Sequence, residues 1–311
     1  MPVFTKARPW RRNRNLPRPR EKAVKSSLLV GASPCSRMSA GDIAHIRPQG
    51  QPPTAHSYKI MTSSLLSSRS TPAKATELHA KASADFAAKL AATQALLHRA
   101  AAEFTPVTQA SSLGAEDVVV THLINRLQLD IPVFVLETGA LHTETLALLE
   151  RTQAHSRAPI VVYRPVQESV IQFVRDQGQD AMYKSIEQRK ACCGVRKMAP
   201  LARALTGQRA WITGLRQEQS TARAEVPLLD TSEETTKGLA KFNPLAKWTW
   251  GDVWHYIATN QVDYNPLHDQ FFPSIGCAPC TRAISLGEEF RAGRWWWEDE
   301  AAKECGLHVK N

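Results

Sequence analysis

Five cysteines in this chain have the type and spacing that could do chemistry. Four of them form two tight pairs, and the fifth stands near the end of the sequence; they are Cys192 and Cys193, Cys277 and Cys280, and Cys305. Four thiolates in two pairs are typical of one metal centre, whereas a single cysteine in a polar segment is typical of a nucleophile. Free cysteine is also a common core residue, so the pattern leaves a packing role open.

The spacing within each pair bears on which metal the four cysteines could hold. Cys277 and Cys280 have ordinary metal-knuckle spacing, but Cys192 and Cys193 are adjacent. Neighbouring side chains of an extended chain point to opposite faces, so we expect this pair to lie in a turn or at the start of a helix. The spacing favours an iron–sulfur cluster over zinc but leaves both open. Disulfides would need an oxidising compartment, and no segment resembles a signal peptide.

Cys305 lies in a segment that suits a reacting thiol. It stands beside Gly306 and three residues before His308. A glycine neighbour keeps such a thiol exposed and mobile, and nearby cations would lower its pKa. We therefore interpret Cys305 as a nucleophile.

Three short polar segments are expected where strands end. They are Ser111-Ser112-Leu113-Gly114-Ala115-Glu116-Asp117, Leu136-Glu137-Thr138-Gly139, and Trp211-Ile212-Thr213-Gly214, the last followed by Arg216 and Arg223. Small residues between a strand and a helix let backbone N–H groups approach a phosphate at the helix N-terminus. Each segment alone could be an ordinary turn, but the three together could hold a nucleotide.

Two groups of cations accompany these segments. Arg196 and Lys197 follow the adjacent cysteines, and Arg291 and Arg294 lie on a glycine-containing loop before three tryptophans. Guanidinium groups bind phosphate or sulfate oxygens in pairs, so these residues could hold an anion near the metal. Solvated surface positions would explain them equally well.

The elements that must position these residues follow from the apolar pattern. A helix is expected over 74–103, and strands are expected over 107–110, 132–136, 159–163 and 209–213. Helical patterns over 115–128, 141–153 and 167–176 separate the strands. This alternation predicts an α/β fold with a mostly parallel sheet and helices on both faces. In such sheets ligands bind at the carboxyl ends of the strands.

The last third of the chain has a different texture. Trp250, Val253, Trp254 and Ile257 share one helical face, which favours a core role. Residues 261–311 are rich in turns and aromatic residues and are expected to form an appended lobe, with a mobile tail over about 285–311.

The positive charge is confined to one part of the sequence. The chain of 311 residues has a net charge of +10, and residues 1–60 hold 12 Lys and Arg against 2 Asp and Glu. The remainder is neutral, so we expect no nucleic-acid partner for the folded body. Residues 1–73 are expected to be a disordered basic extension. It could be a functionless tail, a stretch upstream of an internal start at Met38 or Met61, or a transit peptide. No apolar run is long enough to cross a membrane, and we expect a cytoplasmic protein.

The order of these motifs resembles one known family. The motifs are Ser-Leu-Gly-Ala-Glu-Asp, Leu-Glu-Thr-Gly, Cys-Cys-Gly-Val-Arg-Lys, Trp-Ile-Thr-Gly-Leu-Arg, Gly-Cys-Ala-Pro-Cys-Thr, Arg-Ala-Gly-Arg-Trp-Trp-Trp-Glu and Glu-Cys-Gly-Leu-His. Over about residues 75–311 the chain resembles the assimilatory adenylyl-sulfate (APS) reductases, the iron–sulfur branch of the phosphosulfate reductases. The resemblance implies an adenine nucleotide α-hydrolase-like fold with a modified pyrophosphatase loop.

The resemblance also implies a cofactor, a substrate and an electron donor. It implies one [4Fe-4S] cluster on the two cysteine pairs and a nucleophile at Cys305. The adenosine of APS would lie near Ser111–Gly114, Leu136 and Gly214, and the phosphosulfate would point toward Lys197, Arg291, Arg294 and His308. Thr138, Gly139, Arg216 and Arg223 complete the expected substrate site. Thioredoxin or glutaredoxin would release sulfite from an S-sulfocysteine, in sulfate assimilation toward cysteine.

Alternative functions remain open at this point. A reductase of the 3′-phosphorylated nucleotide (PAPS) shares the terminal cysteine motif, but the resemblance implies that it lacks the four cluster cysteines. An ATP-dependent tRNA thiolation enzyme is disfavoured by the altered loop and the neutral body. A non-catalytic iron–sulfur sensor would leave Cys305 and the arginine loop without a purpose. We leave a homo-oligomer open.

Overall fold

The computed structural model describes residues 73–233 and 238–299. The predicted extension over 1–73 lies outside these ranges except for its last residue, and so do Cys305 and His308. None of the helices in the described ranges is long and apolar enough to cross a lipid bilayer.

A six-stranded sheet forms the centre of the fold. Its order is β3-β2-β1-β4-β6-β5, and every neighbouring pair is parallel except β5 and β6. The strands are β1 (Val107–Ser111), β2 (Val133–Leu136), β3 (Ile160–Tyr163), β4 (Ala210–Ile212), β5 (Leu229–Asp230) and β6 (Ala240–Phe242). The prediction of a mostly parallel sheet is confirmed, and each of the four predicted strands is present.

The chain winds in two directions from the middle of this sheet. From β1 it proceeds outward to β2 and β3 through α3 (Ala115–Arg126) and α4 (Thr143–His155). It then returns through α5 (Gln167–Gln177), α6 (Ile186–Cys193) and α7 (Ala199–Leu205) to β4 on the other side of β1. The strand order therefore reverses between β1 and β4, and such a reversal leaves a crevice at the carboxyl ends of the strands.

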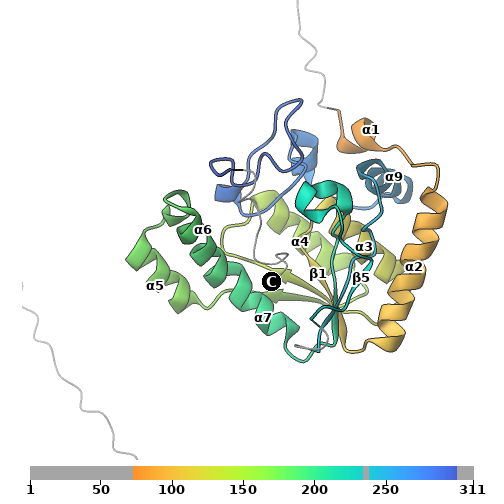
Figure 1. The fold of residues 1–311 in the computed structure, drawn as a ribbon, viewed down its shortest axis with the longest axis horizontal. Helices are drawn as coiled ribbons and strands as arrows, with labels where there is room; N and C mark the ends of the chain where they lie inside the picture. Colours follow the sequence, from red (N-terminus) through yellow and green to blue (C-terminus); the bar gives the residue numbers. More distant parts are fainter. Residues whose placement is uncertain (1–72, 234–237, 300–311) are drawn as a thin grey trace, which may run out of the picture. The chain divides into compact units, whose positions relative to one another are not determined.

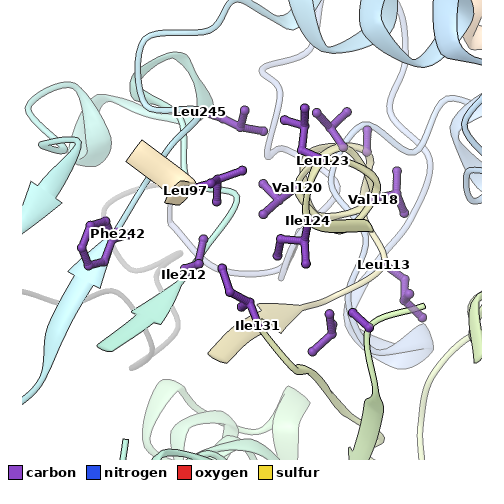
Figure 2. Close-up of a cluster of buried hydrophobic side chains, with 14 of the residues drawn as sticks. Leu97, Leu113, Val118, Val120, Leu123, Ile124, Ile131, Ile212, Phe242 and Leu245 are labelled. Carbon is purple, nitrogen blue, oxygen red and sulfur yellow. The ribbon is translucent and has the colours of Figure 1, made fainter. Parts of the chain in front are cut away.

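Helices cover both faces of the sheet, as predicted. In Figure 1 the green helices α5, α6 and α7 lie on one side, while α2 (Phe86–Glu103), α3 and α9 (Trp250–Asn260) lie on the other. The larger core is on the α3 side, where Figure 2 shows Val120 and Leu123 among side chains from α2 and the strands. The smaller core packs Leu201 and Ala204 of α7 against the sheet. Burial on both faces explains the continuous apolar runs of the central strands β2 and β4.

The predicted helix over 74–103 is wrong in one respect. The structure divides it into α1 (Ala75–His79) and α2, with an irregular segment between them. In this segment the Ser83 N–H donates to Asp252 Oδ1 at 2.7 Å, and the Lys81 N–H donates to the Gly251 carbonyl at 3.3 Å. These tertiary partners replace helical hydrogen bonds, and no periodicity within the segment could reveal them.

The predicted helical stripe of the last third is confirmed as core. Val253, Trp254 and Ile257 of α9 are buried, and Trp250 is partly buried against them. The helix begins with a capping box in which Thr249 and Asp252 exchange hydrogen bonds, both between a side chain and a backbone N–H. Beyond α9 the described chain has no strand of the main sheet and only short 3-10 turns, in agreement with the predicted lobe.

Candidate active site

A cavity of about 200 Å³ opens at the carboxyl ends of β1, β2 and β4, where the strand order reverses. We call it the strand-end cavity. Of the residues predicted to bind substrate, those that line it are Ser111, Ser112, Gly114, Leu136, Thr138, Lys197, Gly214, Arg223, Arg291 and Arg294. Segments far apart in the sequence thus meet at one site, at the carboxyl ends of the strands where such sheets bind ligands.

A buried carboxylate, Asp117 of α3, ties two strand ends together. Its Oδ2 accepts the Ser112 N–H at 2.7 Å and the Ser112 hydroxyl at 2.6 Å, and its Oδ1 accepts the Gly214 N–H at 3.0 Å. Burial raises the pKa of Asp117 to about 6, although these hydrogen bonds act in the opposite direction. The loop after β1 and the loop after β4 therefore depend on one carboxylate for their spacing.

Gly214 is required by close packing in this arrangement. A Cβ added there would lie 2.5 Å from Asp117 Oδ1 and 2.8 Å from Glu116 Cβ. Only a glycine lets the backbone after β4 approach the start of α3 this closely.

The lining of the strand-end cavity combines two kinds of side chain. Phe134, Trp211 and Leu201 belong to one apolar cluster and form its apolar part. Four cations also line it, which are Lys197, Arg223, Arg291 and Arg294. A cavity lined by both apolar side chains and cations can receive a planar heterocycle together with its phosphate-linked anion.

The arginine loop is held in place by Trp295. This residue is 1% exposed, and the guanidinium carbons of Arg294 and Arg291 lie 4.8 and 6.0 Å from its ring centroid. Arg294 also donates to the Ser274 hydroxyl at 3.3 Å and to the Ile275 carbonyl at 3.2 Å. These contacts fix the two guanidinium groups before any anion binds.

Three of the predicted substrate residues do not line this cavity. Arg216 is fully buried and pairs with Glu116 at 2.9 Å and with Glu218 at 3.1 Å, so it braces the loop after β4. Leu113 is packed in the core with a positive φ of 61°. Gly139 lines a second cavity nearby. The two predicted residues Cys305 and His308 lie beyond the last described position.

The second cavity brings the two cysteine pairs together. We call it the cysteine cavity; its volume is about 160 Å³, and Cys192, Cys193, Cys277 and Cys280 all line it. None of the four is in a disulfide, and three of them are buried. Gly139, Arg189, Arg196 and Lys197 also line it.

The adjacent cysteines lie at the end of a helix, and the expected turn or helix start is wrong. Cys192 and Cys193 end α6, which continues through a π-helical turn over Gly194–Met198 into α7. A π turn holds one extra residue and occurs often at functional sites. Helical backbone brings adjacent side chains to neighbouring directions about 100° apart, so both can face one cavity.

The four cysteines of the cysteine cavity are potential metal ligands. Among the described residues, no group of three or more His, Cys, Asp or Glu side chains is arranged to hold a metal ion. Two pairs of thiols that line one cavity are nevertheless of the donor type that zinc and iron–sulfur clusters use. Burial raises the pKa of Cys192 and raises that of Cys280 to about 11, which favours the protonated form of these two thiols.

The two cavities share a wall made by Thr138 and Lys197. Lys197 lines both cavities, and Thr138 lines the strand-end cavity while its Oγ1 lies 3.2 Å from Cys277 Sγ. Arg196 Nη1 donates to the Thr138 carbonyl at 2.7 Å, and the Ala278 N–H donates to the Ala140 carbonyl at 2.7 Å. A structural change in one cavity can therefore reach the other cavity through this single layer of residues.

A buried ion pair joins α6 to the last described segment. Arg189 donates to both carboxylate oxygens of Glu298, at 2.9 and 2.7 Å, and the two side chains are 1% and 3% exposed. The Arg189 guanidinium carbon also lies 4.4 Å from the Trp295 ring centroid. The chain is thus fixed seven residues before Cys305.

Sequence reasoning missed several lining residues of the strand-end cavity. They include Phe134, Glu116, Asp117, Thr213, Gln219, Phe290 and Trp295. Asp117 stood within a recognised motif but read as an ordinary residue of a helix start. The apolar residues carried no signal, because a strand residue lining a cavity and one filling a core look alike in sequence.

Comparisons with known proteins agree with this geometry. The sequence profile of the phosphoadenosine phosphosulfate reductase domain matches residues 106–283. The chain is 51% identical over 218 residues to an adenosine 5'-phosphosulfate reductase of Allochromatium vinosum, covering 70% of this chain and 84% of that one. It is 47% identical over 225 residues to an adenosine 5'-phosphosulfate reductase of Burkholderia cepacia, covering 72% and 89%.

A solved structure shows the same arrangement of strands and helices. The crystal structure of the phosphoadenylyl-sulfate (PAPS) reductase of Candida auris, in a phosphate complex, superimposes with a TM-score of 0.53 and 26% sequence identity. The matched region covers 62% of this chain and 90% of the Candida auris chain.

Proposed function

The chain belongs to the phosphoadenosine phosphosulfate reductase family, and we propose that it reduces adenosine 5′-phosphosulfate (APS) to sulfite and AMP. The observation that carries this proposal is the strand-end cavity, whose lining combines apolar side chains with four cations. APS has the matching form, since an adenosine carries a phosphosulfate anion. Relatives about 50% identical that are named as APS reductases favour APS over its 3′-phosphorylated form.

We further propose that the cysteine cavity holds one [4Fe-4S] cluster on Cys192, Cys193, Cys277 and Cys280. The four thiols line one space and have cations beside them that would balance the negative charge of a thiolate-ligated cluster. When bound, the cluster would supply a fixed charge across the wall from the phosphosulfate. Thr138 and Lys197 would then be held from both sides, which orients the lysine toward the anion.

The chemical step in this proposal is a displacement at sulfur. The Cys305 thiolate attacks the sulfur of the phosphosulfate, an S–S bond forms, and the S–O bond to phosphate breaks with its electron pair leaving on AMP. Lys197, Arg291 and Arg294 would neutralise the charge that accumulates on the leaving phosphate, and His308 is proposed to assist them. Because the anhydride is already activated, the protein mainly supplies positioning and charge.

The second half of the reaction returns the cysteine to its starting state. A thiolate of thioredoxin or glutaredoxin attacks Cys305 Sγ, and sulfite leaves with the electron pair of the S–S bond. The second thiol of the donor then resolves the mixed disulfide, so a dithiol is oxidised by two electrons as the sulfonate is reduced to sulfite. Thiols on this path need a reducing compartment, which supports the cytoplasm as the place of action.

The experiment that tests the proposal measures both halves separately. Anaerobically purified protein is mixed with APS alone, and the intact mass is measured for one added sulfonate group. We expect the adduct with the native protein and none with Cys305→Ser, which should still bind APS. Sulfite release on adding thioredoxin completes the cycle. An adduct on Cys305→Ser, or faster turnover of PAPS than of APS, would contradict the proposal.

The cluster is tested by composition. Iron and acid-labile sulfide should each approach four per chain in the native protein. Zinc in their place would contradict the cluster and leave the substrate proposal standing.

A further inference from the structure

Three aromatic side chains lie together on the surface beside the cysteine cavity. Tyr183 and Trp296 are 42% and 40% exposed, and Trp297 is half-buried between them. The ring centroids of Tyr183 and Trp297 are 4.5 Å apart, and those of Trp296 and Trp297 are 4.7 Å apart, both in edge-to-face geometry. We call these three residues the aromatic patch. The reaction proposed above uses none of them.

The aromatic patch is tied on two sides to the elements beneath it. The Tyr183 hydroxyl donates to the Pro279 carbonyl at 2.6 Å, between Cys277 and Cys280. On the other side, the Glu298 N–H donates to the Trp295 carbonyl at 2.8 Å, and the Glu298 carboxylate is bound by Arg189. Fixed aromatic side chains lose little entropy on binding, which is why tyrosine and tryptophan dominate the energetic centres of protein interfaces.

The position of the patch in the chain limits what can reach it. Cys305 follows Asp299 by six residues, and six residues span at most roughly 20 Å. A typical protein interface covers about 800 Å² on each partner, which corresponds to a disc about 30 Å across. The aromatic patch therefore lies within the distance that the contact surface of a protein attacking Cys305 can cover.

We propose that the aromatic patch is the docking surface for the dithiol protein that releases sulfite from Cys305. This inference rests on the proposed function and adds the place where its electron donor binds. The partner is a protein with an exposed dithiol, and its contact surface is apolar, because the aromatic faces of Trp296 and Tyr183 provide the contact. Docking there would bring the donor thiolate within reach of Cys305 Sγ, where it displaces sulfite as described above.

The test separates an effect on thioredoxin binding from an effect on the chemical steps at Cys305. Native protein, Trp296→Ala and the control Leu286→Ala are loaded with APS to form the adduct, and sulfite release is then started with thioredoxin or with dithiothreitol. Leu286 is a fully exposed apolar side chain on another turn, outside the patch. For Trp296→Ala we expect about a tenfold lower kcat/KM for thioredoxin, with adduct formation and dithiothreitol-driven release within about twofold of native. Trp296→Phe should recover most of the loss.

A second measurement does not depend on the reaction. Isotope-labelled thioredoxin is titrated with unloaded native protein and with Trp296→Ala, and we expect Kd to rise about tenfold for the variant. If the native protein forms no adduct but binding depends on Trp296, the proposed reaction is wrong and the docking surface stands. Equal thioredoxin kinetics and equal Kd for the two proteins would overturn the docking surface. A loss of adduct formation in Trp296→Ala would also overturn it, because the patch would then serve the chain's own segment that carries Cys305.

Discussion

The strand-end cavity and the cysteine cavity share a wall but are built in different ways. The strand-end cavity lies at the reversal of strand order, so the parallel sheet places its loops. The cysteine cavity is lined mainly by the end of α6, a π turn and a short 3-10 turn over Ala278–Cys280, none of which belongs to the sheet, and also by Gly139 and Ala140 of the loop after β2. Its geometry depends on individual polar contacts and on whatever the thiols bind.

This difference predicts where each cavity is vulnerable. The strand-end cavity should tolerate the loss of a polar contact but not a change in backbone packing, since strands and helices crowd its floor. The cysteine cavity should tolerate added volume but not the loss of a pinning contact. Substitutions of each kind, compared across the two cavities, can confirm or refute this contrast.

The largest effect is expected at the ion pair that pins the cysteine cavity. Glu298→Gln leaves the buried Arg189 without its carboxylate, and we expect the free energy of unfolding to fall by about 3–5 kcal/mol. The matched control is Asp263→Asn, which breaks an exposed pair with Arg151 and should cost less than about 1 kcal/mol. Urea unfolding of both variants measures the difference. Equal losses would mean that the buried pair does not hold this region together.

The next effect is expected at the shared wall. Lys197→Ala removes the cation that lines both cavities, and we expect kcat/KM for APS to fall by about 10²–10³. Lys190→Ala on α6 is the control, because Lys190 is exposed and lines neither cavity. Sulfite release measures both. If Lys197→Ala lost iron but kept its turnover per cluster, the lysine would serve the cysteine cavity alone.

Two glycines, one in each region, test the packing contrast directly. Gly214→Ala forces a Cβ against Asp117 and Glu116, and a displacement of this loop by about 1 Å should cost about 10²-fold in kcat/KM. Gly194→Ala, at the start of the π turn, meets no atom within 4 Å and should change activity by less than about twofold. Steady-state kinetics on both variants decide the matter. A severe loss in Gly194→Ala would show that the cysteine cavity is also limited by volume.

The smallest effect is a pH dependence of the strand-end cavity. The pKa of Asp117 is raised from an ordinary 3.8 to about 6 by burial, so the folded protein binds this proton more tightly than the unfolded chain. The stability that this group contributes is complete below pH 4 and is lost as the pH rises through 6.

The affinity for substrate should change in the opposite direction and weaken as the pH falls. Below pH 6 a proton occupies an oxygen that holds Ser112 or Gly214, and KM should rise by about fivefold, the worth of one hydrogen bond. Asp117→Asn should remove the pH dependence of both quantities between pH 4 and 6, and a KM profile unchanged by this substitution would contradict the role of Asp117.

The same contrast explains how much could be predicted from the sequence. The strands and the polar residues at their ends were predicted because apolar runs and loop residues alternate along the chain, as they do at Ser111–Gly114 and at Gly214. The end of α6 was not predicted, because a π turn has no periodic signature and a cysteine pair reads equally as a turn. Arg216 carried the charge of an anion ligand, but it pairs with Glu116, which lies 100 residues earlier in the chain, as well as with its neighbour Glu218. Only the tertiary structure reveals such pairing.

The π turn lies between α6 and α7, which otherwise form one continuous helix, and it rotates the side chains of α6 relative to those of α7. One face of α7 is fixed by Leu201 and Ala204 against the sheet, while Cys192 and Cys193 face the cysteine cavity. Deleting Gly194 would restore regular helix and remove no side chain that binds or packs. It would also rotate the two cysteines by about 100° relative to α7. The direction in which the two sulfur atoms point therefore depends on the number of residues in the turn rather than on the identity of any neighbouring residue.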